Sequence, residues 1–161
     1  MSDNHWESQP RKKNGEFTFR INTNFTKKIL KKVSEEAVEA EIRKTTRGGS
    51  YGFLRKFTAG NKNFEIHHMP SVSSSPLSRW KGPCIIMFKA DHKFTSSYKN
   101  ARGAERYRRW QAKLISEGKF LEAEFMDIKN IQRKCGDRYD KAIMEKLVYE
   151  EELEKAGVIN G

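Results

Sequence analysis

The stretch "NFEIHHMPSVSSSPLSRWKGPCIIMFKADH", residues 63–92, decides the fold and holds three of the chain's four histidines. It contains two strand candidates, residues 63–69 and 83–89, and the second carries a continuous apolar run from Ile85 to Phe88. The segment between them is rich in Ser and Pro, which is typical of a loop. Because Asp91 is a suitable helix N-cap, we expect a helix from there to about residue 98. The stretch therefore predicts strand, long loop, strand and helix.

The residues around this stretch are mostly helical in pattern. Apolar positions recur at helical spacing from about residue 26 to 43, and in three sets after residue 105 that Gly118 and Gly136 separate. The alternation from Phe17 to Ile21 predicts a short strand, and the glycine pair at 48–49 predicts a loop. We expect an α+β fold: a small ββα core with additional packed helices and a mostly helical C-terminal half.

The domain organisation follows from length and composition. At 161 residues and 36% hydrophobic residues, the chain suffices for one modest domain. We expect a leader in residues 1–15, a strand and helix extension in 16–56, and the main domain in 57–161. No apolar run approaches the length of a membrane span, so no membrane insertion is expected. Cys84 and Cys135 lie far apart, which indicates neither a disulfide framework nor a thiolate zinc site.

The net charge is +11, and its distribution along the chain is uneven. Residues 61–120 carry twelve Lys or Arg against four Asp or Glu, whereas residues 121–161 carry seven against ten. The positive charge therefore surrounds the histidines. Such a surface attracts polyanions through phosphate contacts, so nucleic acid is the expected partner.

The histidines and one carboxylate form a candidate site. In a strand, Glu65 and His67 share one face, whereas His68 points the other way unless the strand ends there. His92, at the start of the following helix, is placed to face the same point. One imidazole can bind a metal while another accepts a proton from water near neutral pH. This combination within a basic surround favours a metallonuclease.

The same residues resemble a known family. Glu65, His67, His68 and His92, with "MP", "SPLSR", "KGP" and "ADH" around them, are similar to the core of the HNH/endonuclease VII-like nuclease toxins, specifically the group with a Glu-His-His-His signature. The resemblance covers about the last hundred residues. It implies a ββα-metal nuclease fold.

The resemblance also implies a role for each residue of the site. His67 and His92 would bind one divalent ion (Mg²⁺, Zn²⁺ or Ni²⁺), and His68 would activate the attacking water. Glu65 would be a third ligand or an acceptor that orients His67, and Asp91 is the rival third ligand.

Basic residues outside the signature are candidates for contacts to nucleic acid. Arg79, which matches the family pattern, and Lys81 are expected to clamp phosphates from the loop between the strands. Further candidates are Lys93, Arg102, Arg106 and Arg109. The arginines are expected to follow the nucleic-acid backbone from the helix face opposite Tyr107 and Trp110, which we assign to the core.

The expected function is a metal-dependent endonuclease that serves as the toxin module of a bacterial competition system. DNA is favoured over RNA as the substrate. The resemblance implies that the domain is secreted or delivered as part of a larger toxin, acts in the target-cell cytoplasm, and is neutralised by a cognate immunity protein. The charge of the chain leads us to expect an acidic one. The alternatives are an RNase toxin and a non-catalytic nucleic-acid-binding protein with a structural metal site.

Overall fold

The computed structural model describes residues 23–159, which divide between Glu39 and Ala40 into two parts. The first part is the beginning of helix α1 (Thr23–Thr45), where exposed Lys–Glu pairs one turn apart each contribute about 0.3–0.5 kcal/mol at most. The helix predicted from about residue 26 to 43 is confirmed. The predicted leader and the strand at 17–21 lie outside the described residues.

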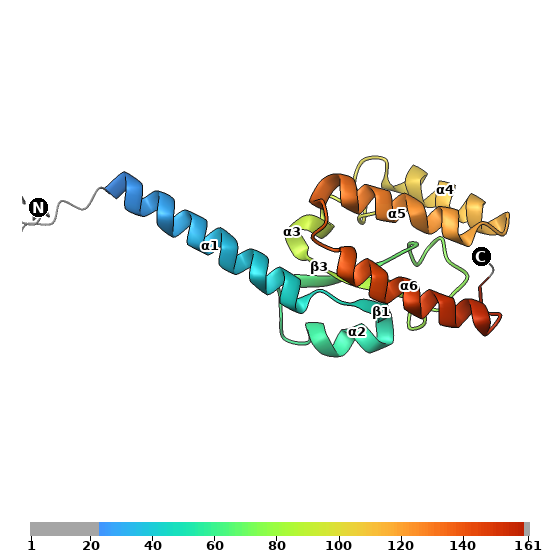
Figure 1. Ribbon diagram of the computed structural model, residues 1–161. Helices are drawn as coiled ribbons and strands as arrows, with labels where there is room; N and C mark the ends of the chain where they lie inside the picture. Colours follow the sequence, from blue (N-terminus) through green and yellow to red (C-terminus); the bar gives the residue numbers. More distant parts are fainter. Residues whose placement is uncertain (1–22, 160–161) are drawn as a thin grey trace, which may run out of the picture. The chain divides into compact units, whose positions relative to one another are not determined.

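The second part, from Ala40 onward, contains a three-stranded antiparallel sheet among its described residues. Its order is β1 (Gly48–Ser50), β3 (Pro83–Phe88) and β2 (Phe64–His68), with His67 opposite Ile85. Side chains alternate between the two faces of a strand, yet every residue from Pro83 to Met87 is buried. Both faces of β3 are therefore covered, by α2 (Tyr51–Thr58) and by α6 (Asp140–Lys155) (Figure 1). The two strands predicted at 63–69 and 83–89 are confirmed.

The loop predicted at the glycine pair is wrong, because these residues form β1 and α2 follows at once. A Cβ on Gly48 would lie 1.9 Å from the carbonyl oxygen of Ala142, so only glycine lets β1 lie this close to α6. The Gly48 amide donates to the Glu145 carboxylate at 3.0 Å. Ser50 then caps α2 by accepting a hydrogen bond from the Phe53 amide. The predicted division at residue 56 falls within α2.

The helix after β3 is shorter than predicted. Helix α3 spans only Lys89–His92, and turns replace the helix expected up to residue 98. Asp91 is not its N-cap, because its carboxylate accepts hydrogen bonds from Arg138 at 2.7 Å and from the Tyr139 hydroxyl at 2.5 Å. The same hydroxyl accepts a hydrogen bond from the Phe88 amide. These contacts fasten α3, and with it His92, to the start of α6.

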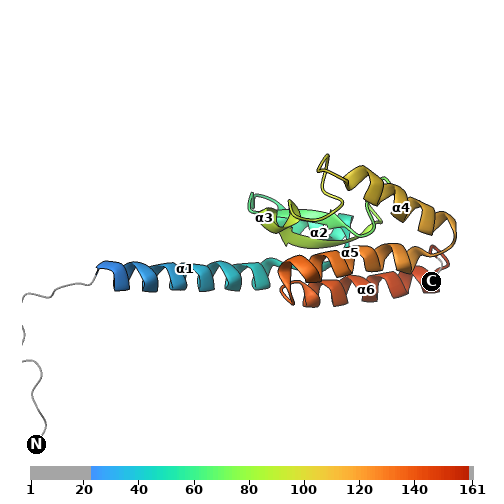
Figure 2. The same cartoon turned by 90° about the horizontal axis from the view of Figure 1, so that it is seen from above.

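The C-terminal half is helical, as predicted, with α4 (Ala104–Ser116), α5 (Phe120–Cys135) and α6 in succession. The predicted breaks fall at Gly118 and Gly136, which adopt φ values of 75° and 61° that favour glycine. Helices α4 and α5 lie side by side (Figures 1 and 2). No helix among residues 23–159 is long and apolar enough to cross a membrane.

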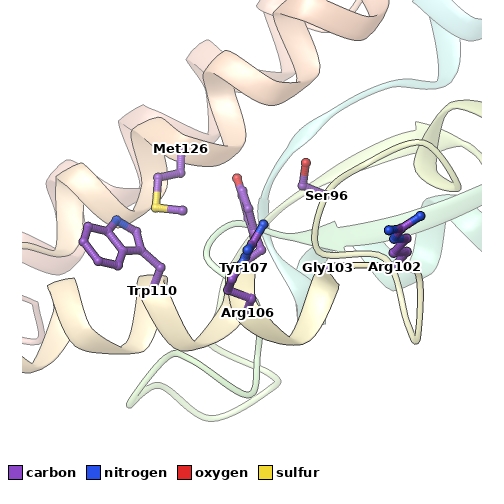
Figure 3. A pocket seen from close by; sticks show the side chains of 7 residues that line it. All are labelled: Ser96, Arg102, Gly103, Arg106, Tyr107, Trp110 and Met126. Atoms are coloured by element: carbon purple, nitrogen blue, oxygen red, sulfur yellow. The ribbon is translucent and has the colours of Figure 1, made fainter.

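The assignment of Trp110 to the core is wrong, and Arg106, which was expected on the opposite face of the helix, lies on the same side as Trp110. Trp110 is 52% exposed and, with Tyr107, Arg102 and Arg106, lines a hollow between α4 and α5 (Figure 3). Tyr107 is only half-buried, and its hydroxyl donates to Asp127 at 3.0 Å. Helical spacing identified the face of α4 that carries both aromatic rings, but Trp110 on that face is exposed to solvent.

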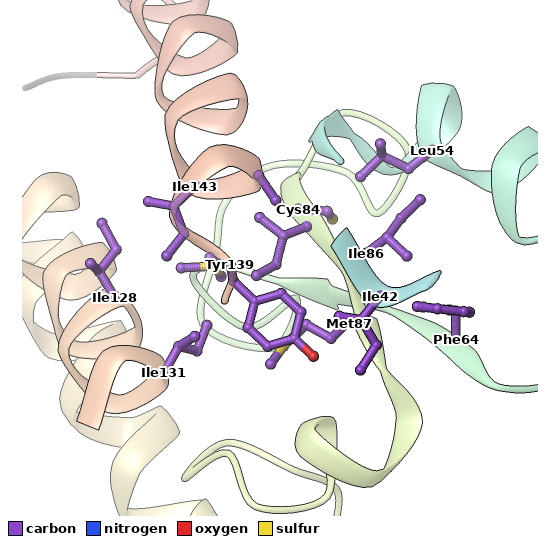
Figure 4. Packing of buried hydrophobic residues seen from close by; sticks show 13 residues of the cluster. Ile42, Leu54, Phe64, Cys84, Ile86, Met87, Ile128, Ile131, Tyr139 and Ile143 are labelled. Carbon is purple, nitrogen blue, oxygen red and sulfur yellow. The ribbon is translucent and has the colours of Figure 1, made fainter. Parts of the chain in front are cut away.

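The main core lies around the sheet (Figure 4). Leu54 of α2, Ile86 and Met87 of β3, Ile131 of α5 and Tyr139 are each less than 2% exposed. Burying a large apolar side chain stabilises the fold by about 1.5–3 kcal/mol, so this cluster holds β3 and both covering layers together. It fixes the sheet that contains β2, on which His67 and His68 lie.

A charged cluster is buried between α5 and α6. Lys146 of α6 is fully buried, and its ammonium group donates to Glu124 of α5 and, at 2.8 Å, to Glu150. Burial lowers the pKa of Lys146 to about 8 and raises the pKa of Glu150 to about 7. The cluster ties α5 to α6 through partnered charges.

Candidate active site

The first part of the site is a chain of three side chains from β2 and α3. Nδ1 of His67 lies 3.0 Å from Nε2 of His92, and Nδ1 of His92 lies 2.8 Å from the Glu65 carboxylate. Glu65 and His67 are two residues apart on β2, so they lie on one face of the strand and both reach His92. Glu65 therefore orients His92 and not His67. Asp91, the rival ligand, is engaged with Arg138 and Tyr139 instead.

Burial is the main electrostatic influence on these histidines. It lowers the pKa of His67 well below its ordinary value, and neighbouring His92 lowers it further. Burial also lowers the pKa of His92, although the Glu65 carboxylate opposes this effect. Both rings are therefore held as neutral imidazoles near pH 7, the form that binds metal ions.

His68, the last residue of β2, has different neighbours. Its ring stacks on Tyr51 of α2 at 5.0 Å between centroids, and its Nε2 lies 3.0 Å from the Arg79 carbonyl oxygen. Because a carbonyl only accepts, Nε2 carries the proton and the lone pair of the neutral ring is on Nδ1. A Cβ on Gly82 would lie 2.8 Å from Cδ2 of His68, so this ring position requires glycine at residue 82.

The two parts of the site open into adjoining hollows. One, of about 300 Å³, is lined by His67, His68 and His92 together with Lys99. The other, of about 310 Å³, shares His92 and Lys99 and is also lined by Arg55, Arg79 and Glu65. The three histidines therefore reach a common solvent-accessible space, although His68 approaches it from another face of β2.

The donor nitrogens of His67 and His92 fit a divalent ion. Metal–nitrogen bonds of 2.0–2.1 Å place two imidazole nitrogens on one ion about 3 Å apart, which matches His67 and His92. A group of three His, Cys, Asp or Glu side chains arranged to hold a metal is not found among residues 23–159. The pair fits an ion that takes its remaining ligands from water and phosphate oxygens. Cys84 is no candidate ligand, since it is buried and burial raises its thiol pKa well above the usual value.

The predicted basic residues fall into three groups. Arg79 lines the site, and its exposed guanidinium donates a hydrogen bond to the Tyr51 hydroxyl at 2.9 Å. Arg102 and Arg106 line the separate hollow beside Trp110. The others are exposed and line neither hollow of the histidine site: Lys81, Lys93 and Arg109.

Four residues of the site were missed by sequence reasoning. Tyr51 and Gly82 position His68, and Lys99 lines both hollows with a left-handed backbone φ of 40°. Arg108 donates to the carbonyl oxygens of Ser97 and Lys99 and so holds this segment in place. The Lys-Gly-Pro sequence indicated that Gly82 lies in a turn. No local pattern in the sequence identifies Tyr51 as a neighbour of His68.

Comparisons with protein-family models, with curated proteins and with solved structures find no match for this chain.

Proposed function

We propose that this protein is a metal-dependent endonuclease that hydrolyses phosphodiester bonds in nucleic acid. The observation that carries the proposal is the placement of two neutral imidazoles, His67 and His92, 3.0 Å apart beside a third, His68, in one open site. The net charge of +11 and the basic side chains around the site favour a polyanionic substrate.

The residues of the chain have distinct tasks in this reaction. His67 and His92 would hold the ion, and Glu65 fixes the ring of His92 by accepting its other ring proton. A bound divalent ion would stabilise the negative charge that develops on the phosphate and leaving oxygens. His68, held with its proton on Nε2, presents Nδ1 as the acceptor for a proton from the attacking water. Arg79 and Lys99 attract the phosphate into the site.

The biological setting that we propose is the toxin module of a bacterial competition system. Its support is the resemblance of residues 65–92 to the Glu-His-His-His group of nuclease toxins. A cell that produces such an enzyme must block it, and an acidic immunity protein would associate rapidly with this basic surface. Delivery as part of a larger toxin and action in the target-cell cytoplasm belong to the same proposal.

The test is incubation of the purified chain with supercoiled plasmid DNA and, in parallel, with structured RNA. We expect DNA nicking that a chelator abolishes and that added Mg²⁺, Zn²⁺ or Ni²⁺ restores. Cleavage of RNA alone would identify the enzyme as an RNase. The absence of cleavage under every metal condition would contradict the proposal.

A second candidate is a protein that binds nucleic acid without cleaving it. The observation that favours it is that the His67–His92 contact is also satisfied as a hydrogen bond between two neutral rings. Salt-sensitive DNA binding without cleavage, by protein supplied with each metal, would support this candidate over the first.

A further inference from the structure

The hollow between α4 and α5 combines cationic and aromatic side chains. Its volume is about 420 Å³, and Arg102, Arg106 and the exposed indole of Trp110 line it, with Met126 opposite the indole (Figure 3). An exposed indole offers a stacking surface for any nucleobase, and a guanidinium binds phosphate through several donors. A nucleotide has both a base and a phosphate, so a hollow with an indole and guanidinium groups suits it better than a hollow with only one of them.

The wall of this hollow is held by buried polar contacts. Asp127 accepts hydrogen bonds from the Tyr107 hydroxyl at 3.0 Å and from the Gln111 amide at 2.7 Å. Asn130 accepts from the Ser96 amide and donates to the Ser96 hydroxyl, both at 2.8 Å. Tyr107 and Ser96 line the hollow, so its shape is fixed by these contacts. A fixed pocket loses less entropy when it binds a ligand.

The hollow lies next to the histidine site along one short segment. Ser96 lines the hollow beside Trp110, whereas the next three residues, 97–99, line the site that contains His67, His68 and His92. Consecutive Cα atoms are about 3.8 Å apart, so one nucleic-acid strand can reach both places. The Arg108 side chain donates to the carbonyl oxygens of Ser97 and Lys99 and so holds this segment between the hollow and the histidine site.

We infer that this hollow receives an unpaired base of the nucleic-acid substrate, which stacks on Trp110 while Arg102 and Arg106 hold the adjacent phosphates. The inference rests on the proposed function for the identity of the ligand as nucleic acid. A base in a duplex has both faces covered by its neighbours. The substrate is therefore bound as a single strand, or with a nucleotide turned out of the duplex beside the cleavage site.

The test is fluorescence anisotropy of a labelled oligothymidylate of about eight nucleotides with the full chain, in chelator so that cleavage does not interfere. We expect the single strand to bind more tightly than a blunt duplex of equal length. Trp110→Ala should weaken single-strand binding by roughly 5- to 150-fold, and Trp110→Phe should retain most of the affinity. Phe125→Ala is the matched control, because Phe125 is 51% exposed on α5 and does not line the hollow.

The arginines provide a second measurement. Arg102→Ala and Arg106→Ala should each weaken binding and lower the salt dependence more than Arg109→Ala, which removes the same charge from outside the hollow. Thymidine 5′-monophosphate should compete with the oligonucleotide better than inorganic phosphate, because only the nucleotide carries a base.

Three results would overturn the inference: no binding of the single strand, parental affinity in Trp110→Ala, or equal competition by inorganic phosphate. Failure of the nuclease proposal has a different signature. A protein that cleaves nothing but binds the single strand through Trp110 would contradict the catalytic proposal and leave the base-binding site intact.

Discussion

The histidine cluster and the Lys146 cluster, both within residues 23–159, differ in access to solvent. His67 and His92 line a hollow of about 300 Å³, and Glu65 lines the adjoining hollow of about 310 Å³. Lys146 and its glutamate partners lie in the interior between α5 and α6. Burial shifts pKa values in both clusters. A perturbed pKa therefore does not by itself distinguish a reactive site from a structural ion cluster, whereas access for a substrate does.

The chemical composition of the two clusters agrees with this difference. In the Lys146 cluster the buried ammonium group is partnered by two carboxyl groups, which reduces the cost of holding charge in a sealed interior. The histidine cluster instead presents neutral donor nitrogens to an open space. We therefore expect changes at the histidines to affect activity, and changes at Lys146 to affect stability.

The largest expected effect is on catalysis. His68→Ala should reduce the plasmid cleavage rate by about 10²- to 10⁴-fold, because it removes the proposed proton acceptor. The fold should persist, since His68 is only half-buried at the end of β2. Initial rates and a thermal melt are the measurements. A folded variant with a rate near that of the parent protein would show that His68 is not the base.

The next effect is on stability. Lys146→Ala should lower the free energy of unfolding by about 3–5 kcal/mol, because it leaves Glu124 and Glu150 without their buried cation. The control is Lys141→Ala, which removes an exposed lysine of the same helix from a 3.9 Å pair with Glu145 and should cost less than about 1 kcal/mol. Denaturant titration of both variants measures the difference. Similar losses of unfolding free energy in the two variants would mean that the buried Lys146 cluster contributes no more to stability than an exposed ion pair.

A smaller effect on catalysis is expected at Gly82. Gly82→Ala places a methyl group 2.8 Å from the His68 ring and should displace it, with a loss of up to about 10² in rate. In Gly52→Ala the new methyl group would come no closer than 3.4 Å to Trp80, so this control should cleave normally. Kinetics of the two variants, each checked for folding, decide the point. Parental activity in Gly82→Ala would show that the ring position is not critical.

The last expected effect is on the pH dependence of stability, and it is small over any one pH unit. Burial raises the pKa of Asp127 from 3.8 to about 7, against hydrogen bonds from Gln111 and Tyr107 that lower it. The folded protein thus keeps a proton that the unfolded chain releases, so this group's contribution to stability falls as pH rises from about 4 to 7 and is level above. The slope is at most about 1.4 kcal/mol per pH unit.

Asp127→Asn is the variant that isolates this contribution. It should remove that part of the slope, which denaturant titrations at several pH values would measure. Equal slopes for the parent and variant would contradict the assignment.

Sequence reasoning located the elements whose patterns are local. The apolar run of β3, the periodicity of α4 to α6 and the breaks at Gly118 and Gly136 are all readable along the chain. The period of two in a strand also placed Glu65 and His67 on the same face, where both contact His92. These results follow from backbone geometry and need no knowledge of tertiary contacts.

The features that were missed depend on contacts between distant segments. Gly48 lies in a strand because β1 packs against the backbone of α6, about a hundred residues later. The position of the His68 ring depends on Tyr51 and Gly82, which lie on either side of it in sequence. Trp110 has the spacing of a core residue, but the hollow between α4 and α5 leaves its side chain 52% exposed. Local patterns contain none of this information.

The proposed reaction requires that His67 and His92 together hold one divalent ion beside the base His68. Calorimetric titration of Zn²⁺ or Ni²⁺ into the parent protein and three variants tests it most directly. We expect one site in the parent and in His68→Ala, and loss of that site in both His67→Ala and His92→Ala. A parent protein that binds no divalent ion, or His67→Ala and His92→Ala proteins that bind it as tightly as the parent, would contradict the account.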